Sequence, residues 1–234
     1  MRNLTQSDFI ALWETGRSLH PLDQGILALQ AAFPEMQSVV ADWPLGRRNR
    51  ALAELHFAAF GSALRGWTAC RGCAERLEFE IDGRNLEKNL ALDSEACVMV
   101  NGHRYRLPTS RDLAAVAREP DADTAARLLL QQCSTAHELP ESAFDEEQME
   151  AVGESMAAAD PLAEIRLGLD CPNCGVHFEE SVDLPSFLWA EMEARAKRAL
   201  MEVHTLASAY GWSQAEILSL TSARRQLYVE MVRA

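Results

Sequence analysis

The hydrophobic pattern of this 234-residue chain changes from helix to strand and back to helix. Over residues 4–66, apolar side chains recur every three or four positions between turn residues, which is typical of amphipathic helices. Three helices are predicted there: one capped by Ser7 and ending at Gly16, one opened by Pro21, and one over residues 50–64. Three large aromatic side chains are expected in the core: Trp43, Phe60 and Trp67.

From Trp67 onward the period falls to two. Leu77, Phe79 and Ile81 alternate with acidic residues, as in a strand with one buried face. Two further short strands flank Asn101-Gly102, a pair favoured in tight hairpin turns, and another strand is expected over residues 162–169. Residues 67–107 and 162–184 are therefore predicted to form one small antiparallel sheet.

The remaining segments have helical patterns. Gly211 ends a long helix that starts near Ser186, and Ser213 with Glu216 forms a capping box for the next one. The predicted fold class is α+β, mostly α. Its parts are an N-terminal helical region over 1–66, a split sheet over 67–107 and 162–184, a helical insertion over 108–161, and a C-terminal helical unit over 185–234.

Two Cys-x2-Cys pairs give the chain its clearest chemical signal. Cys70 and Cys73 are separated from Cys171 and Cys174 by 97 residues, and each pair precedes a strand-like run. Two such pairs that each open a strand are typical of a zinc ribbon, in which four thiolates bind one Zn²⁺ tetrahedrally. One structural zinc is predicted at these four residues. It would bring the two ends of the chain together around the insertion.

Other interpretations of the cysteines remain open. An iron site or a redox pair is possible in principle, although a thioredoxin-type Cys-x2-Cys normally opens a helix rather than a strand. His177 follows Cys174 by three residues and is an alternative fourth ligand. Cys97 and Cys133 lie in apolar stretches and are predicted to be small buried side chains.

Catalytic motifs are absent from the sequence. It has no recognisable nucleophile elbow, Gly-rich phosphate loop or metalloprotease His-Glu helix. A zinc ion bound by four thiolates has no open position at which to activate water. His204 falls within a helical apolar pattern, where a hydrogen-bonded packing role is predicted. The sequence thus indicates a protein without enzymatic activity or small-molecule substrate.

Charge is distributed unevenly. The net charge is −13, and residues 119–183 carry sixteen acidic side chains against Arg127 and Arg166. Such a segment repels phosphate backbones, so nucleic acid is not an expected partner. A solvated helical face or a surface for a basic protein both fit this charge. No apolar run approaches the roughly 20 residues of a membrane span, and no signal peptide is recognisable, so a cytoplasmic protein is expected.

A DNA-binding regulator is the second functional hypothesis. The turn around Gly211 lies between helices, as in a helix-turn-helix, and Arg224 and Arg225 would then contact phosphates. The helix after the turn carries Glu216 and no basic side chain, which disfavours base recognition.

Several short motifs in the C-terminal region occur together with the cysteine pairs. They are Phe187-Leu188-Trp189, Glu202-Val203-His204, Leu206-Ala207, Tyr210-Gly211-Trp212-Ser213, Glu216-Ile217-Leu218, Arg224-Arg225 and Tyr228, and, nearer the start, Leu45-Gly46-Arg47-Arg48-Asn49-Arg50 and Phe60-Gly61. In these motifs the chain resembles T-even-type contractile phage baseplate proteins, whose relatives occur in phage-tail-like injection systems. The resemblance covers most of the chain and is weakest over 111–160. Arg71 stands where a proline is common in such cysteine pairs.

This resemblance implies a non-enzymatic role in a baseplate. The chain would be an assembly factor (a chaperone) for the central hub or a structural component, with hub or wedge proteins as partners. It would then work in the cytoplasm or within the assembled particle. Residues 186–234 are expected to present a surface for such a protein through Trp189, Tyr210, Trp212 and Arg225. Alternatively, Trp212 staples its helix and Tyr210 fills the core.

Overall fold

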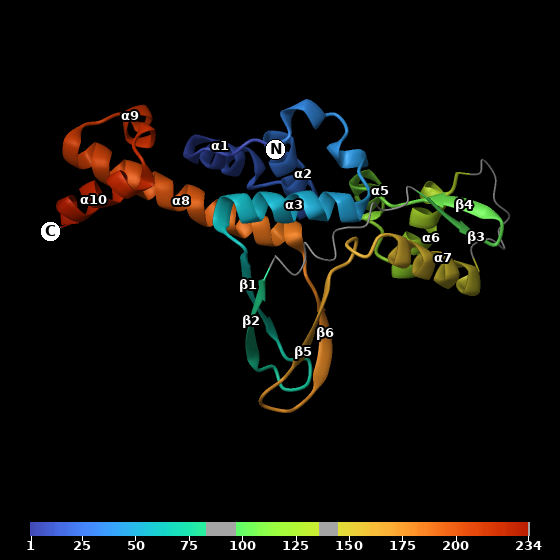
Figure 1. Ribbon diagram of the computed structural model, residues 1–234. Coiled ribbons are helices and arrows are strands. Elements are labelled where there is room, and N and C mark those ends of the chain that lie inside the picture. The colour runs from blue at the N-terminus through green and yellow to red at the C-terminus, as the bar shows by residue number, and fades with distance from the viewer. Residues whose placement is uncertain (83–96, 136–144, 234) are drawn as a thin grey trace.

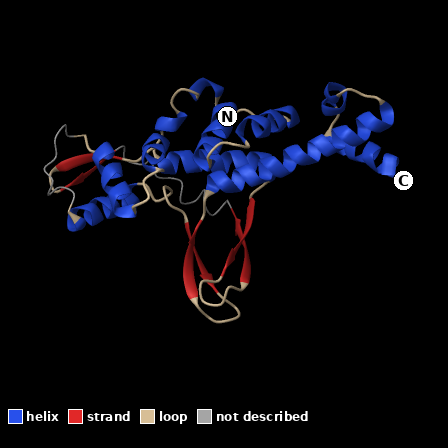
Figure 2. Cartoon of the chain, turned by 180° about the vertical axis from the view of Figure 1, so that it is seen from behind, coloured by secondary structure: helices blue, strands red, loops and turns tan. Residues whose placement is uncertain are grey.

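The computed structural model describes residues 1–82, 97–135 and 145–233. A helical body carries three extensions, which are a pair of β-hairpins, a module of helices and one hairpin, and a helical tail (Figure 1). Helices dominate, and the strands form short antiparallel pairs (Figure 2). The predicted class, α+β and mostly α, is confirmed. Parts of the predicted sheet and insertion that fall on residues 83–96 and 136–144 lie outside the described residues.

The helical body is built around one long helix. Three N-terminal helices bury their apolar faces against the first half of α8, where Leu188 and Met192 are 2% and 0% exposed. Trp43 also lies in this core, as predicted. Although α8 has 27 residues, no helix among the described residues is long and apolar enough to cross a membrane. The helices of the body are α1 (Gln6–Gly16), α2 (Pro21–Ala32), α3 (Leu45–Phe60) and α8 (Leu184–Tyr210), with 3₁₀ turns η1 (Pro34–Met36) and η2 (Val40–Asp42) before α3.

Local hydrogen bonds set two helix starts that differ from the predicted ones. Helix α1 begins at Gln6 because Thr5, rather than Ser7, is its cap: Thr5 and Asp8 form a capping box. Arg2 pairs with the Asp8 carboxylate at 2.9 Å, and this bond holds the pKa of Asp8 below its usual range. Helix α3 starts at Leu45, before the predicted Arg50, because the N–H of Leu45 donates to the Pro108 carbonyl at 3.0 Å.

Two hairpins form what we call the ribbon. In each, two strands pair antiparallel, and the hairpins extend side by side away from the body (Figure 1). Trp67, predicted to be buried, is 60% exposed and lies under the Arg76 guanidinium at 4.8 Å from its ring centroid. The ribbon strands are β1 (Ala63–Ala69), β2 (Arg76–Asp82), β5 (Arg166–Asp170) and β6 (His177–Ser181).

The third hairpin belongs elsewhere, so the predicted single sheet is wrong. The described strands form three two-stranded sheets. The hairpin with the Asn101-Gly102 turn was correctly predicted, but its Val98 and Tyr105 pack on Val152 and Met156 of the insertion, not on the ribbon. We call residues 97–160 the insertion module. Its elements are β3 (Cys97–Val100), β4 (His103–Arg106), α5 (Ser110–Val116), α6 (Ala122–Cys133) and α7 (Glu146–Ala159).

The far end of α8 carries the tail unit, which we define as residues 200–233. Gly211 ends α8 in the left-handed conformation (φ 70°), and Ser213 and Glu216 form the predicted capping box of α9 (Gln214–Ser219). The final helix is α10 (Ser222–Arg233). A small cluster of Leu206, Ile217 and Val229 is its core.

Buried polar groups join the insertion module to the body. The Gly46 N–H donates to the Asp160 carboxylate at 2.8 Å, and Arg48 donates to Ser110 Oγ at 3.3 Å. Asp160 and Arg48 are 4% and 5% exposed. Burial raises the pKa of Asp160 and lowers the pKa of Arg48, and each charge moderates the shift of the other. A Cβ at Gly46 would overlap the Asp160 carboxylate, so this contact requires glycine.

Gly16→Ala is expected to destabilise the body. A Cβ there would collide with the ring of Trp189 and meet Leu27 at 3.0 Å, and overpacking of this kind typically costs about 1–3 kcal/mol. Gly153→Ala in α7 is the matched control, since a Cβ there meets no atom within 4 Å. Alanine's better helix propensity should make that variant more stable by up to about 1 kcal/mol. Urea unfolding measures both changes. Equal stability of the two variants would contradict the described packing.

Candidate metal centre

The four cysteines of the two pairs meet at one point. Their sulfur atoms all lie within 4.8 Å of one another. Cys70 Sγ is 3.6 Å from Cys174 Sγ, and Cys73 Sγ is 3.6 Å from Cys171 Sγ. A disulfide bond would be about 2.05 Å, so these are separate thiols rather than bridges. This arrangement can hold a metal ion.

Both cysteine pairs have the same backbone geometry. In the first, the N–H of Cys70 donates to the Glu75 carbonyl at 2.8 Å, and the Ala74 N–H returns to the Cys70 carbonyl at 2.8 Å. In the second, the N–H of Cys171 donates to the Val176 carbonyl at 3.0 Å, and the N–H of Gly175 donates to the Cys171 carbonyl at 2.8 Å. The positions after the second cysteine are both left-handed, with φ of 60° at Ala74 and 72° at Gly175. Each loop thus turns both of its sulfurs toward the shared centre.

Electrostatics at the cluster favour a bound cation. The Glu75 N–H and the Asn173 side chain lower the pKa of Cys73 to about 7. The Val176 N–H favours the Cys174 thiolate, but burial and the neighbouring sulfurs outweigh it and raise the pKa of Cys174 to about 12. Thiolates this close repel one another. A cation would remove that repulsion and let all four deprotonate.

The surroundings of the cluster suit a structural site. Cys70 and Cys171 are buried against Leu77 and Phe178, whereas Cys73 and Cys174 lie on the solvent side. The Asn173 amide donates to Cys73 Sγ at 3.5 Å across the two loops. The turns of both hairpins lie at the end of the ribbon away from the body (Figures 1 and 2).

The expectation that the metal joins the two ends of the chain needs correction. The apolar core between α1–α3 and α8 already joins them. The four cysteines instead bring the end of one hairpin to the end of the other. Thr68 Oγ1 supports this contact by donating to Glu180 Oε2 at 3.2 Å.

Other candidate ligands lie outside the cluster. His177 Nδ1 is 2.9 Å from the Asp170 carboxylate, and the group of converging sulfurs does not include it. Cys133 is fully buried, as predicted, and burial raises its pKa to about 12. Cys97 is only half-buried and accepts a bond from Arg104 Nε at 3.0 Å. His204 is exposed on α8, so its predicted packing role is wrong.

The four predicted partner-binding residues are not on one surface. Trp189 is 8% exposed and sits in the body core over Gly16. Arg225 is 3% exposed, and its Nε donates to Glu202 Oε2 at 2.8 Å. Both side chains therefore serve packing. The helical spacing of apolar residues does not indicate whether a single aromatic or arginine side chain is buried or exposed.

Tyr210 and Trp212 form an aromatic group in the tail unit. Their rings stack with centroids 4.8 Å apart, and Tyr228 meets Trp212 edge-on at 5.1 Å. Trp212 packs on the Ile217 cluster, as expected of a hydrophobic staple. Tyr210 is 41% exposed, so of the four predicted residues it is the most accessible to a partner.

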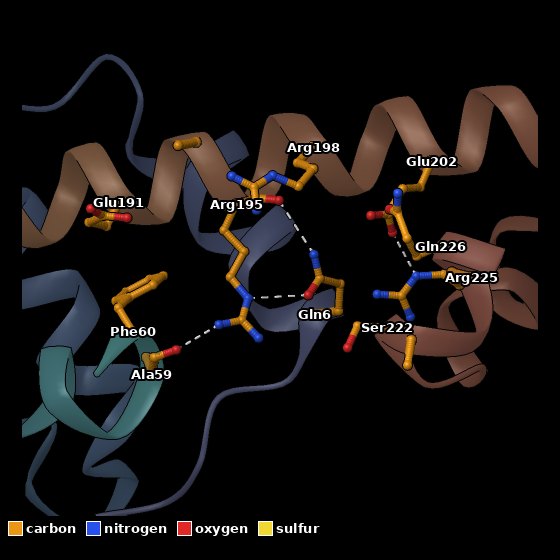
Figure 3. A pocket seen from close by; sticks show the side chains of 12 residues that line it. Gln6, Ala59, Phe60, Glu191, Arg195, Arg198, Glu202, Ser222, Arg225 and Gln226 are labelled. Carbon is orange, nitrogen blue, oxygen red and sulfur yellow. Dashed lines mark hydrogen bonds and ion pairs between the residues drawn. The ribbon is translucent and has the colours of Figure 1, made fainter. Parts of the chain in front are cut away.

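A cleft of about 610 Å³ separates the body from the tail unit along α8 (Figure 3). Sequence analysis did not single out Arg195, which points into it. Its Nη1 donates to the Ala59 carbonyl at 2.8 Å, and its guanidinium lies 4.7 Å from the centroid of the Phe9 ring. Burial lowers the pKa of Arg195, with Arg198 and Arg225 adding repulsion. The Arg195 side chain thus joins α8 to the end of α3, and we assign it a structural role.

Comparisons with known proteins identify no relative. No protein-family model, curated protein or solved structure matches this chain.

Cys171→Ser is expected to abolish metal binding and loosen the ribbon while leaving the body folded. The reason is that metal binding contributes directly to the folding of small sites, whereas the body has its own core. Elemental analysis would show loss of metal, and hydrogen exchange would accelerate in the four ribbon strands but not in α1, α2 and α8. Cys97→Ser is the control and should keep the metal, because Cys97 lies outside the cluster. Full metal content in Cys171→Ser would contradict the site.

Proposed function

We propose that this chain is a non-enzymatic assembly factor, or a structural component, of the baseplate of a contractile phage tail or a phage-tail-like injection system. It acts through protein–protein contacts with hub or wedge proteins. The observation that carries the proposal is that four cysteines converge on one site, able to hold a structural metal, in a ribbon that projects from the body. The motifs that resemble baseplate proteins support the choice of system.

We further propose that the metal is zinc, in a structural role. With zinc–sulfur bonds of about 2.3 Å, neighbouring sulfurs of a tetrahedral site are about 3.8 Å apart. The two sulfur–sulfur contacts of 3.6 Å agree with this spacing. Four thiolates complete the coordination, so the ion would serve folding rather than activate water.

The shape of the molecule supports a role as scaffold or chaperone. Ribbon, insertion module and tail unit extend in different directions from one body (Figure 1). Each therefore offers a separate surface to large partners. For the regulator hypothesis, Arg224 and Arg225 would have to contact phosphates; Arg224 is exposed, but Arg225 is buried against Glu202. We accordingly favour the assembly role.

Zinc is expected at one ion per chain. Protein purified without chelator should contain this amount by elemental analysis and should show no visible absorption. Iron bound by four thiolates would colour the protein and contradict the zinc assignment. Cobalt substitution provides a positive control, since Co²⁺ in a tetrahedral thiolate site absorbs in the visible range.

Deleting the gene for this chain in its own host is expected to stop production of complete contractile tails. Electron microscopy of purified particles measures this, and complementation with the unaltered chain should restore them. Tyr210→Ala should still fold, with a melting temperature lowered only slightly by the lost stacking on Trp212, because Tyr210 is 41% exposed, and yet should reduce assembly if the tail unit contacts a partner.

The outcomes separate the functional alternatives. Mass spectrometry of finished particles distinguishes a structural component, which remains, from a chaperone, which leaves. Normal tails in the deletion strain would refute the proposed function. Binding to promoter DNA that weakens steeply with salt would favour the regulator instead.

A further inference from the structure

A groove in the insertion module runs between α6 and α7 toward the loop that leads into β5. Its volume is about 580 Å³, within the usual range of ligand sites. Both helices contribute to its lining, which is mainly apolar. The lining residues from the two helices are Ala126, Leu129 and Leu130 on α6 and Met149, Gly153, Met156 and Ala157 on α7.

Part of this lining belongs to the core of the module, and part is open to solvent. Leu130 and Met156 are each 7% exposed and pack in the cluster with Val152. Leu129 and Met149 are only partly buried at its edge. The groove is thus a continuous apolar surface. Its floor, formed by Leu130 and Met156, is held in place by the core of the module.

Gly153 lies in the middle of α7 and in the groove. Glycine in a helix interior lowers helix stability relative to alanine. A Cβ at Gly153 would meet no atom within 4 Å, so no contact within the described residues requires glycine there. The missing side chain leaves room for another chain to approach the backbone of α7 closely.

An acidic row borders the groove. Glu146, Glu150 and Glu154 follow one another at four-residue spacing, so they share one face of α7, and Glu150 lies three residues from Gly153 on the adjoining face. None of the three glutamates has an ion pair with another described residue. Glu164 and Arg166 also line the groove and pair with each other at 3.0 Å, so the cation is balanced and the three glutamates of the row make the rim net negative.

We infer that this groove binds an amphipathic helix of a protein partner, one with an apolar face flanked by lysine or arginine. Apolar grooves between helices recognise such segments, and flexible methionines such as Met149 and Met156 adapt to the inserted side chains. The glutamate row would attract the flanking cations and accelerate association. The inference rests on the proposed function and specifies the chemistry of the partner surface that the chain would cover.

A second copy of this chain is a less suitable occupant. Its α10 exposes Leu227 and Met231, at 57% and 65%, and carries both Arg224 and Glu230 beside them. Each chain has a net charge of −13, however, so two copies repel one another. Self-association of the chain through this groove would overturn the inference.

The test uses a labelled synthetic helix of about 18 residues, long enough to form several turns, with leucines on one face and lysines elsewhere. Fluorescence anisotropy with the full-length, metal-loaded chain should show binding that weakens with added salt. A peptide with glutamate in place of every lysine should not bind. Equal binding of both peptides would overturn the role of the acidic rim.

Gly153→Leu places a side chain in the groove from a position where a Cβ meets no atom within 4 Å, and it should weaken peptide binding at least tenfold. Ala158→Leu is the matched control, because Ala158 is exposed on α7 about 140° around the helix from Gly153 and is not part of the groove. Thermal melting confirms that both variants fold. Equal weakening in both, or in neither, would overturn the inference.

Two further measurements define the occupant. Glu150→Gln should weaken binding of the lysine peptide and flatten its salt dependence. Sedimentation of the chain alone should show no association that Gly153→Leu removes; such association would identify a second copy as the occupant. If Gly153→Leu supports tail assembly normally while the gene deletion blocks it, the groove inference fails and the proposed function stands. If the deletion has no effect on tails, the proposed function fails whatever the peptide does.

Discussion

Burial of one face of α8 is the constraint on which the rest of the structure depends. Its first half supplies Leu188, Trp189 and Met192 to the body core, and burying a large apolar side chain contributes about 1.5–3 kcal/mol. Its second half continues past the body and carries the tail unit. One helix therefore fixes the position of residues near both ends of the chain. Arg195, which bonds to Ala59 and covers Phe9, holds α8 at the point where the body ends.

The insertion module is held by a different kind of interaction. At the junction, Asp160 accepts the N–H of Gly46, and Arg48 binds Ser110, all with little exposure to solvent. Because an unpaired buried charge is costly, these groups have few alternative arrangements. Directional polar contacts of this kind set the orientation of the module, whereas a purely apolar contact would let it slide. The groove between α6 and α7 is presented to solvent in a defined direction as a result.

The convergence of the four cysteines could be predicted from the sequence, whereas the strand pairing could not, and the reason is physical. Four sulfurs at one ion must satisfy a fixed local geometry, and the two Cys-x2-Cys loops carry that geometry in their own spacing. Strand partners depend on tertiary packing. The alternation around Val98 and Tyr105 is the same whether the hairpin packs on the ribbon or on α7, so the hairpin was assigned to the wrong sheet. The capping box at Ser213 is local, and the helix start there was predicted correctly.

Exposure was the hardest property to predict from single residues. Trp67 alternates with polar residues and was expected inside, yet each ribbon hairpin is too small to bury both of its faces. At the cysteine end of the ribbon, the apolar cluster consists of Leu77, Phe178, partly buried Leu169 and two of the cysteines, whereas Leu64, Ile81 and Leu167 at the other end pack on the body core. Isolated two-stranded hairpins are marginally stable in water, and a core this small does not change that. We therefore propose that the cysteine end of the ribbon depends on a bound metal for its rigidity, whereas the body is held by its own apolar core. Loss of the metal would then loosen this end of the ribbon and leave the body folded.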